Sequence, residues 1–294
     1  MSGTPQITST IIKRTSSSQK KTADPYYEDN TKYLLEVHTI QCMKFKWLFC
    51  VIKDLLFDCN IHFDQAGMKI CDLDRSNVGL VHLRLPSVHF AKYHCPKPLM
   101  LGLSITSLHK YLGHITQNNK TTLKMLVTED NPNQLILEII CDDDNDIQRF
   151  KMKLLDLDLN PASLEGEHFK CVINMPSDKF QRYCRSHALV GDVMDIITVG
   201  DQVKFMTEPA DGDATESIIR ANKEEQSSIF LADKDDMIAG RFSLKFLQMF
   251  AKAQNLSPSV IIYFKQDFPL VLLYRMEDLG ELKFALSPQV SDAY

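Results

Sequence analysis

Residues 152–170 read MKLLDLDLNPASLEGEHFK, and this stretch divides the chain into two parts. Residues 152–159 alternate apolar and polar side chains, a pattern typical of a strand with one buried face. The sequence then becomes polar at Asn160 and Pro161, gains acidic residues and returns to a strand-like pattern at Phe169. We interpret residues 155–169 as an acidic connector between two folded bodies.

The chain of 294 residues is long enough for two domains of about 130 residues each. Residues 1–31 are rich in Ser, Thr, Lys and Gln, which bury too little apolar surface to fold, so we predict a disordered N-terminal tail. No apolar run reaches the length that a membrane helix needs. The eight cysteines form no CxxC pair, and we expect reduced thiols in an intracellular protein.

The two sides of the connector repeat one order of elements: strand, helix, several strands, helix and several strands. Apolar residues at helical spacing predict helices at residues 43–58, 106–115, 179–189 and 243–254. An α+β unit with so few helices must place them on one side of its sheets. We predict a duplicated α+β fold with a tail, a first domain, a connector and a second domain at residues 1–31, 32–154, 155–169 and 170–294.

Charge is distributed unevenly along the chain. The formal net charge is −5, yet the predicted helices are rich in Lys and Arg and poor in acidic residues. On any single helix, an excess of Lys and Arg over acidic residues is explained by an ordinary solvent-exposed face. The same excess on all the predicted helices favours a basic surface that the helices share. A basic surface without base-reading motifs binds the phosphate backbone of nucleic acid with no sequence preference.

Motifs that carry catalysis are missing from the sequence. There is no phosphate-binding glycine loop and no nucleophile elbow. The acidic run Asp142–Asp146 lacks the ligand spacing of a calcium loop, and we interpret it as the solvated tip of a hairpin. The Asp-Leu-Asp stretches at residues 72–74 and 156–158 place both acids on one strand face, which we expect to face solvent. We predict no catalytic residue, no metal and no cofactor.

Four stretches together resemble one family, the sliding clamps called proliferating cell nuclear antigen. They are GMKICDLDRSNVGLVHLRL at 67–85, LGLSITSLHKYL at 101–112, MKLLDLDLNPASLEGEHFKCVINMPSDKF at 152–180 and DFPLVLLYRMEDLGELKFALSP at 267–288. The resemblance implies a ring of three two-domain subunits in which helices line a channel and antiparallel sheets lie outside. It implies a homotrimeric DNA sliding clamp that encircles duplex DNA, acts as a DNA polymerase processivity factor and docks replication and repair partners.

The resemblance also assigns candidate residues. The basic positions of the channel, with Lys44 as an added candidate, fall on Lys44, Lys46, Lys53, Lys110, Arg182, Arg185, Lys245 and Lys252. The pocket for the hydrophobic plug of DNA polymerase, clamp loader and other clients falls on Leu73, Asn77, Val78, Leu80, Ala162, Leu164, Phe169, Phe268, Pro269, Pro288 and Gln289. Strand edges near Phe150, Ile218 and Ile219 are expected to pair between subunits, because pairing closes exposed edges.

The sequence departs from the family pattern at several of these places. Trp47 and Gly113 stand where the family has basic residues, so the channel is expected to be less basic. In the pocket, Asn77, Ala162 and Gln289 replace His, Leu and Lys. We therefore expect an apolar pocket with altered client preferences.

Two alternatives keep the fold but change the assembly. One is a subunit of a heterotrimeric checkpoint clamp, and the other is a monomeric processivity factor of the viral type. Basic residues on all the predicted helices and an apolar connector pocket favour the homotrimer. We expect it in the nucleus, or at a viral replication site if the source is a virus, with no membrane association.

Overall fold

The computed structural model describes residues 32–116, 120–141, 146–158, 168–209, 212, 214–221, 227–231 and 237–289. The predicted tail and connector residues 159–167 therefore lie outside the described residues, as do Asp142 to Asn145 of the acidic run. Residues from Tyr33 onward form one compact unit.

The half that precedes the connector contains the predicted two helices and a series of strands. Its elements are β1 (Tyr33–Thr39), α1 (Cys42–Ile52), β2 (Asp58–Asp64), β3 (Gly67–Leu73), β4 (Gly79–Pro86), the 3₁₀ turn η1 (Ser87–His89), β5 (Lys92–His94), β6 (Leu99–Ser104), α2 (Ile105–Leu112), β7 (Thr121–Thr128), β8 (Asn131–Cys141) and β9 (Asp146–Lys153).

The half that follows the connector repeats this order. Its elements are β10 (Cys171–Pro176), α3 (Ser177–His187), β11 (Val193–Val199), β12 (Gln202–Thr207), β13 (Thr215–Arg220), β14 (Ser228–Leu231), β15 (Ile238–Ser243), α4 (Leu244–Ala251), the 3₁₀ turn η2 (Lys252–Asn255), β16 (Ser259–Phe264), β17 (Leu270–Met276) and β18 (Gly280–Leu286). The structure thus confirms the duplicated α+β architecture.

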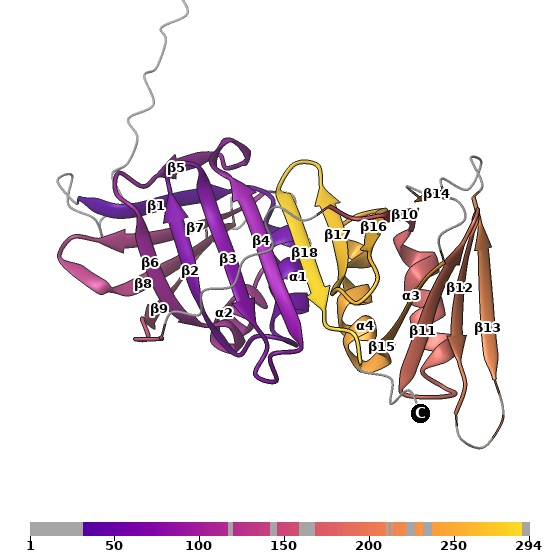
Figure 1. Ribbon diagram of the computed structural model, residues 1–294. Helices are drawn as coiled ribbons and strands as arrows, with labels where there is room; N and C mark the ends of the chain where they lie inside the picture. Colours follow the sequence, from indigo (N-terminus) through magenta and orange to yellow (C-terminus); the bar gives the residue numbers. More distant parts are fainter. Residues whose placement is uncertain are drawn as a thin grey trace, which may run out of the picture. The chain divides into compact units, whose positions relative to one another are not determined.

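The strands form antiparallel sheets of five, nine and four strands. The five-stranded order is β5-β1-β7-β8-β9 and the four-stranded order is β13-β12-β11-β15. The nine-stranded sheet, β14-β10-β16-β17-β18-β4-β3-β2-β6, contains strands of both halves. Figure 1 shows where they meet: β18, in yellow, lies beside β4, in purple, and Leu282 pairs with Leu83 there.

A glycine permits this junction. Gly280 begins β18 at a φ of +145°, and a Cβ atom added to it would lie 2.2 Å from the carbonyl oxygen of Arg84 on β4. A side chain would clash with the neighbouring backbone at that distance, so only glycine fits the start of the joining strand.

The helices form one layer against the sheets. On α1, the buried residues Phe45, Leu48, Phe49 and Ile52 recur at helical spacing and face the core. Helix α1 contacts α2 on one side and η2 on the other, while α3 contacts both α4 and η2. One apolar core runs through both halves beneath this layer. The polar sides of all the helices therefore share one surface, as the duplication predicts.

The helices are shorter than the sequence pattern predicted, because α1 ends at Ile52 and not at residue 58, and α2 ends at Leu112 and not at residue 115. All eight cysteines are free, and burial raises the pKa of Cys42 and Cys171 to about 11, so these thiols are protonated at neutral pH. Within the described ranges, no helix is both long and apolar enough to span a bilayer.

Candidate nucleic-acid and partner interfaces

The basic residues of α1 have contacts within the protein. The Nζ of Lys44 lies 2.9 Å from the Oδ2 of Asp278, in the turn before β18. Lys46 donates hydrogen bonds to the carbonyl oxygens of Gly113 and Ile115 at 3.0 and 2.7 Å. These carbonyls follow the last residue of α2, where the helix dipole is negative and a cation is stabilising. Lys46 therefore joins α1 to the end of α2.

A carboxylate connects the two halves within the helix layer. Asp54 accepts a hydrogen bond from Lys53 at 3.1 Å and another from Lys252, on η2, at 2.6 Å. Burial alone raises the pKa of Asp54, but the hydrogen bonds and charges of Lys252 and Lys53 outweigh burial and leave that pKa below its ordinary value. Nearby on α2, burial and then the charge of Lys53 lower the pKa of His109.

The other basic candidates are more exposed. Arg182 lies 3.6 Å from Asp178 one helical turn earlier, in an exposed pair that contributes little to stability. Lys110, Arg185 and Lys245 are exposed and have no ion-pair partner among the residues that the structure describes. Arg185, Lys245 and Lys252 line a cavity of about 300 Å³ between α3 and α4. The structure thus brings cations of both halves to one layer.

Two apolar side chains also reach solvent from this layer. Trp47 on α1 is 42% exposed, and Leu189, just after α3, is 88% exposed. The tryptophan is therefore only half-covered by its neighbours. It adds an aromatic surface where the family pattern has a cation.

An apolar row crosses the nine-stranded sheet on the face away from the helices. Its cross-strand neighbours are Leu73, Leu80, Ala285, Val271 and Tyr263, in that order. Gly79, one residue before Leu80, faces α4, because a Cβ there would contact the ring of Phe246 at 3.1 Å. Successive strand residues point to opposite faces, so the row faces away from the helix layer.

Aromatic residues extend the apolar row beyond Tyr263, which is the end formed by the second half of the chain. The ring centroid of Phe169 lies 5.3 Å from that of Tyr263 and 5.7 Å from that of Phe268. Leu80, Val271 and Ala285 form a small buried cluster with Phe169, Leu73, Tyr263 and Cys71 packed against it. The structure therefore brings together three predicted pocket residues, Leu73, Leu80 and Phe169, around one apolar surface.

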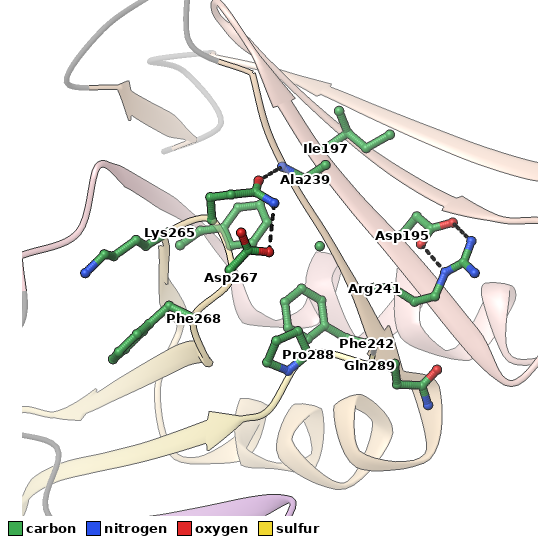
Figure 2. Close-up of a pocket in the computed structure, with 13 residues that line it drawn as sticks. Asp195, Ile197, Ala239, Arg241, Phe242, Lys265, Asp267, Phe268, Pro288 and Gln289 are labelled. Atoms are coloured by element: carbon green, nitrogen blue, oxygen red, sulfur yellow. Dashed lines mark hydrogen bonds and ion pairs between the residues drawn. The ribbon is translucent and has the colours of Figure 1, made fainter. Parts of the chain in front are cut away.

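The remaining pocket residues on the second half border a cavity of about 280 Å³. Phe268, Pro288 and Gln289 line it, and Pro269 follows Phe268 directly. Figure 2 shows Lys265 and Phe268 on one side of Pro288, and the ion pair of Arg241 and Asp195 on the other. The backbone N–H of Gln289 donates to the carbonyl oxygen of Arg241 at 2.8 Å, so the C-terminal segment lies along β15.

Two turns beside this surface have unusual backbone conformations. Asn77 and Asp267 have φ values of 56° and 54°, and no other non-glycine residue in the described ranges has a positive φ. Both residue types tolerate this left-handed conformation better than most. The carboxylate of Asp74 fixes the first turn by accepting from the N–H groups of Val78 and Gly79 at 2.8 and 2.6 Å. The predicted pocket residues Asn77 and Val78 are thereby held in place.

The predicted interface residues lie on strands at sheet edges. Strand β9 is one edge of the five-stranded sheet, and β13 is one edge of the four-stranded sheet. On β13, Ile218 is 43% exposed, whereas Ile219 is buried. On β9, Phe150 stacks on Tyr111 with ring centroids 4.8 Å apart, and Ile147 is 48% exposed. Ile147 and Ile218 therefore present apolar surface on these two edge strands.

Sequence reasoning missed several of these residues. Ile147, Tyr263, Val271 and Ala285 were not predicted; Tyr263 and Val271 lie in continuous apolar runs, in which the sequence pattern does not mark one face of the strand. The contact of Asp54 with Lys252 could not be predicted, because sequence spacing does not show which residues of distant helices meet. Ala162 and Leu164 of the predicted pocket lie outside the described residues. The structure describes no group of His, Cys, Asp and Glu side chains that could hold a metal ion.

Comparisons with known proteins agree with this architecture. The model of the proliferating cell nuclear antigen N-terminal domain matches residues 34–162, and that of the C-terminal domain matches residues 163–289. The chain is 31% identical over 266 residues to a probable DNA polymerase sliding clamp 1 of Paramecium bursaria Chlorella virus 1, which covers 90% of this chain and 100% of the viral protein. The chain belongs to the proliferating cell nuclear antigen family of sliding clamps, which are polymerase processivity factors and not enzymes.

Proposed function

We propose that three copies of this chain form a closed ring around duplex DNA and keep a DNA polymerase attached to its template. The observation that carries this proposal is the shared layer of helices, in which basic residues of both halves lie on one surface. Because such contacts reach phosphates and not base edges, the ring binds any sequence and moves along the duplex. The site of action is a nuclear or viral replication site.

Ring closure uses the free edges of the two outer sheets. We propose that β9 of one subunit pairs with β13 of the next, with Ile147 and Ile218 in the contact. Pairing satisfies backbone groups that an edge strand leaves open, and it covers two exposed apolar side chains. Residues 32–154 and 170–294 then act as the two clamp domains of each subunit, joined by the connector at residues 155–169.

Client proteins dock on the face away from DNA. The apolar row and Phe169 offer a surface for a short hydrophobic plug of a polymerase, a clamp loader or a repair protein. The turn at Asn77, which Asp74 holds in place, borders that surface, so this part of the pocket is preformed, which lowers the entropic cost of binding.

The decisive experiment measures assembly and topology together. Native mass spectrometry is expected to give three times the chain mass of 33.6 kDa. After loading by a clamp loader, the protein is expected to remain on circular DNA in high salt and to be released when that DNA is cut. A stable monomer would favour the monomeric processivity factor. A trimer that forms only with two other chains would favour the checkpoint clamp.

A further inference from the structure

The chain is hydrogen-bonded to two different sheets where the connector begins. The backbone N–H of Leu154, just before the connector, donates to the carbonyl oxygen of Asn133 on β8 at 3.0 Å. The next N–H, that of Leu155, donates to the carbonyl oxygen of Gly102 on β6 at 2.8 Å. Strand β6 is an edge of the nine-stranded sheet, so the connector closes part of this edge.

The connector then continues over one face of the nine-stranded sheet. The side-chain amide of Asn60, on β2, donates to the carbonyl oxygen of Asp158 at 3.1 Å and more weakly to that of Leu157 at 3.5 Å. Strand β2 lies one strand inside the edge, so these two connector residues reach past β6. Closure of the edge alone does not require these contacts.

The face that the connector reaches is the face of the apolar row. His62 on β2 is the cross-strand neighbour of Lys69 on β3, so their side chains share a face. Side chains two or four residues apart on one strand also share a face, which relates Asn60 to His62 and Lys69 to Leu73. Asn60 and Leu73 therefore lie on the same face, where we propose that clients dock.

A glycine makes room for the connector on this face. Gly102 is the cross-strand neighbour of Asn60. A Cβ atom added to Gly102 would overlap the carbonyl oxygen of Leu155 and lie 3.3 Å from the Cγ of Leu157. The φ of Gly102 is not positive, so alanine strains no backbone torsion there and acts by displacing the connector.

We propose that Asn60 and Gly102 are positioning residues that hold the start of the connector on the client face, an inference that rests on the proposed function. At the far end of the connector, Phe169 packs against Tyr263 on the same face. A segment that is fixed at both ends has fewer conformations to lose when a hydrophobic plug binds against it. The anchor thus lowers the entropic cost of docking without touching the client.

Two variants of the full-length protein test the anchor. Gly102→Ala displaces the connector, and Asn60→Asp replaces an amide donor with a carboxylate that repels the two carbonyl oxygens. Each is expected to weaken binding of a fluorescent plug-type peptide, measured by anisotropy, by about fivefold, the contribution of one typical hydrogen bond. Hydrogen exchange at the Leu155 amide should become about fivefold faster or more in both variants.

Three further measurements separate positioning from a general structural role. The melting temperature of both variants is expected to stay within about 3 °C of the wild type. Asn60→Gln keeps the amide donors and should restore peptide binding to within about twofold of the wild type. His62→Asp places the same charge on the same face of β2, where the structure describes no hydrogen bond to the connector, and should bind the peptide normally.

The possible failures are distinguishable. Unchanged exchange at Leu155, or wild-type peptide affinity despite faster exchange, would overturn the inference and leave the proposed docking surface in place. An equal loss of affinity in His62→Asp would assign the effect to charge and would also overturn the inference. Wild-type protein that binds no plug-type peptide would instead overturn the proposed docking of clients.

Discussion

The Nζ of Lys252 lies 2.6 Å from the Oδ2 of Asp54, and this ion pair joins the two halves of the chain within the helix layer. The same carboxylate contacts Lys53 at 3.1 Å. Asp54 thus reduces the positive potential of a surface that is otherwise rich in cations. We expect it to weaken DNA binding while it stabilises the subunit.

Asp54→Asn should increase duplex affinity by about fivefold at low salt, because an interaction of about 1 kcal/mol between unit charges in water is removed. The variant should also unfold at a lower temperature. The lowered pKa of Asp54 means that its contribution to stability is present above the unfolded pKa of about 3.9 and is lost as pH falls through the folded pKa. Anisotropy and thermal unfolding between pH 7 and 3 measure both effects.

Asp64→Asn is the matched control for this variant. Asp64 also has a lowered pKa, caused first by its hydrogen bond from Lys69, but it lies on β2 and not in the helix layer. The control should lose stability without any gain in DNA affinity. A gain of similar size in both variants would mean that net charge, and not the position of Asp54, determines binding.

Leu73→Ala should weaken binding of a plug-type client peptide by about tenfold or more, because a large side chain of the apolar row is lost from a client contact. Isothermal titration calorimetry with a synthetic peptide measures the affinity. Val88→Ala, at a highly exposed site on η1, is the control and should bind normally. Undiminished peptide affinity in the Leu73 variant would place the client site elsewhere.

Ile218→Glu should shift the assembly from trimer to monomer, because a charge is placed on a free edge strand that we expect another subunit to cover. Analytical ultracentrifugation across a range of protein concentrations measures the shift. Phe230→Glu makes the same kind of change on β14, an edge of the nine-stranded sheet, where the side chain is 63% exposed. The proposed ring contact is wrong if the Phe230 variant dissociates and the Ile218 variant does not.

His187 should make the second half sensitive to acid. Its ring is fully buried, with Nδ1 3.0 Å from the Oγ1 of Thr207 and Nε2 3.0 Å from the Oγ of Ser217, and burial lowers its pKa. Above its unfolded pKa of about 6.5, the histidine is neutral in both states and the folded protein keeps its full stability. As pH falls from there through the lowered folded pKa, the unfolded chain binds the proton more readily than the folded protein, and stability is lost. Chemical unfolding at pH 7.5, 6.5 and 5.5 should show this loss.

His187→Gln should lose stability at pH 7.5 but show a flatter dependence on pH than the wild type. The exposed His62, replaced by Gln, serves as the control and should keep the wild-type dependence. An unchanged pH dependence in the His187 variant would assign the acid sensitivity to another group.

The sequence predicted the elements and their order well, because each depends on local spacing. The repeated order of strands and helices gave the duplication, and the stretch at residues 101–112 contains α2 as expected. Contacts between distant residues could not be predicted in the same way. The pairing of Lys252 with Asp54, and of Lys46 with the α2 terminus, depends on how the helices pack together. The apolar row likewise depends on strand register, which places Leu80, Ala285 and Val271 side by side only after the sheet has formed.

The pairing of β18 with β4 also affects how the chain is made. During synthesis the first half emerges early, but its edge at β4 has no neighbour until the last strand leaves the ribosome. An exposed edge is prone to pair with other chains, and contacts between distant residues form slowly. Nascent chains of this protein therefore have a long interval in which β4 is open to a chaperone or to another nascent chain.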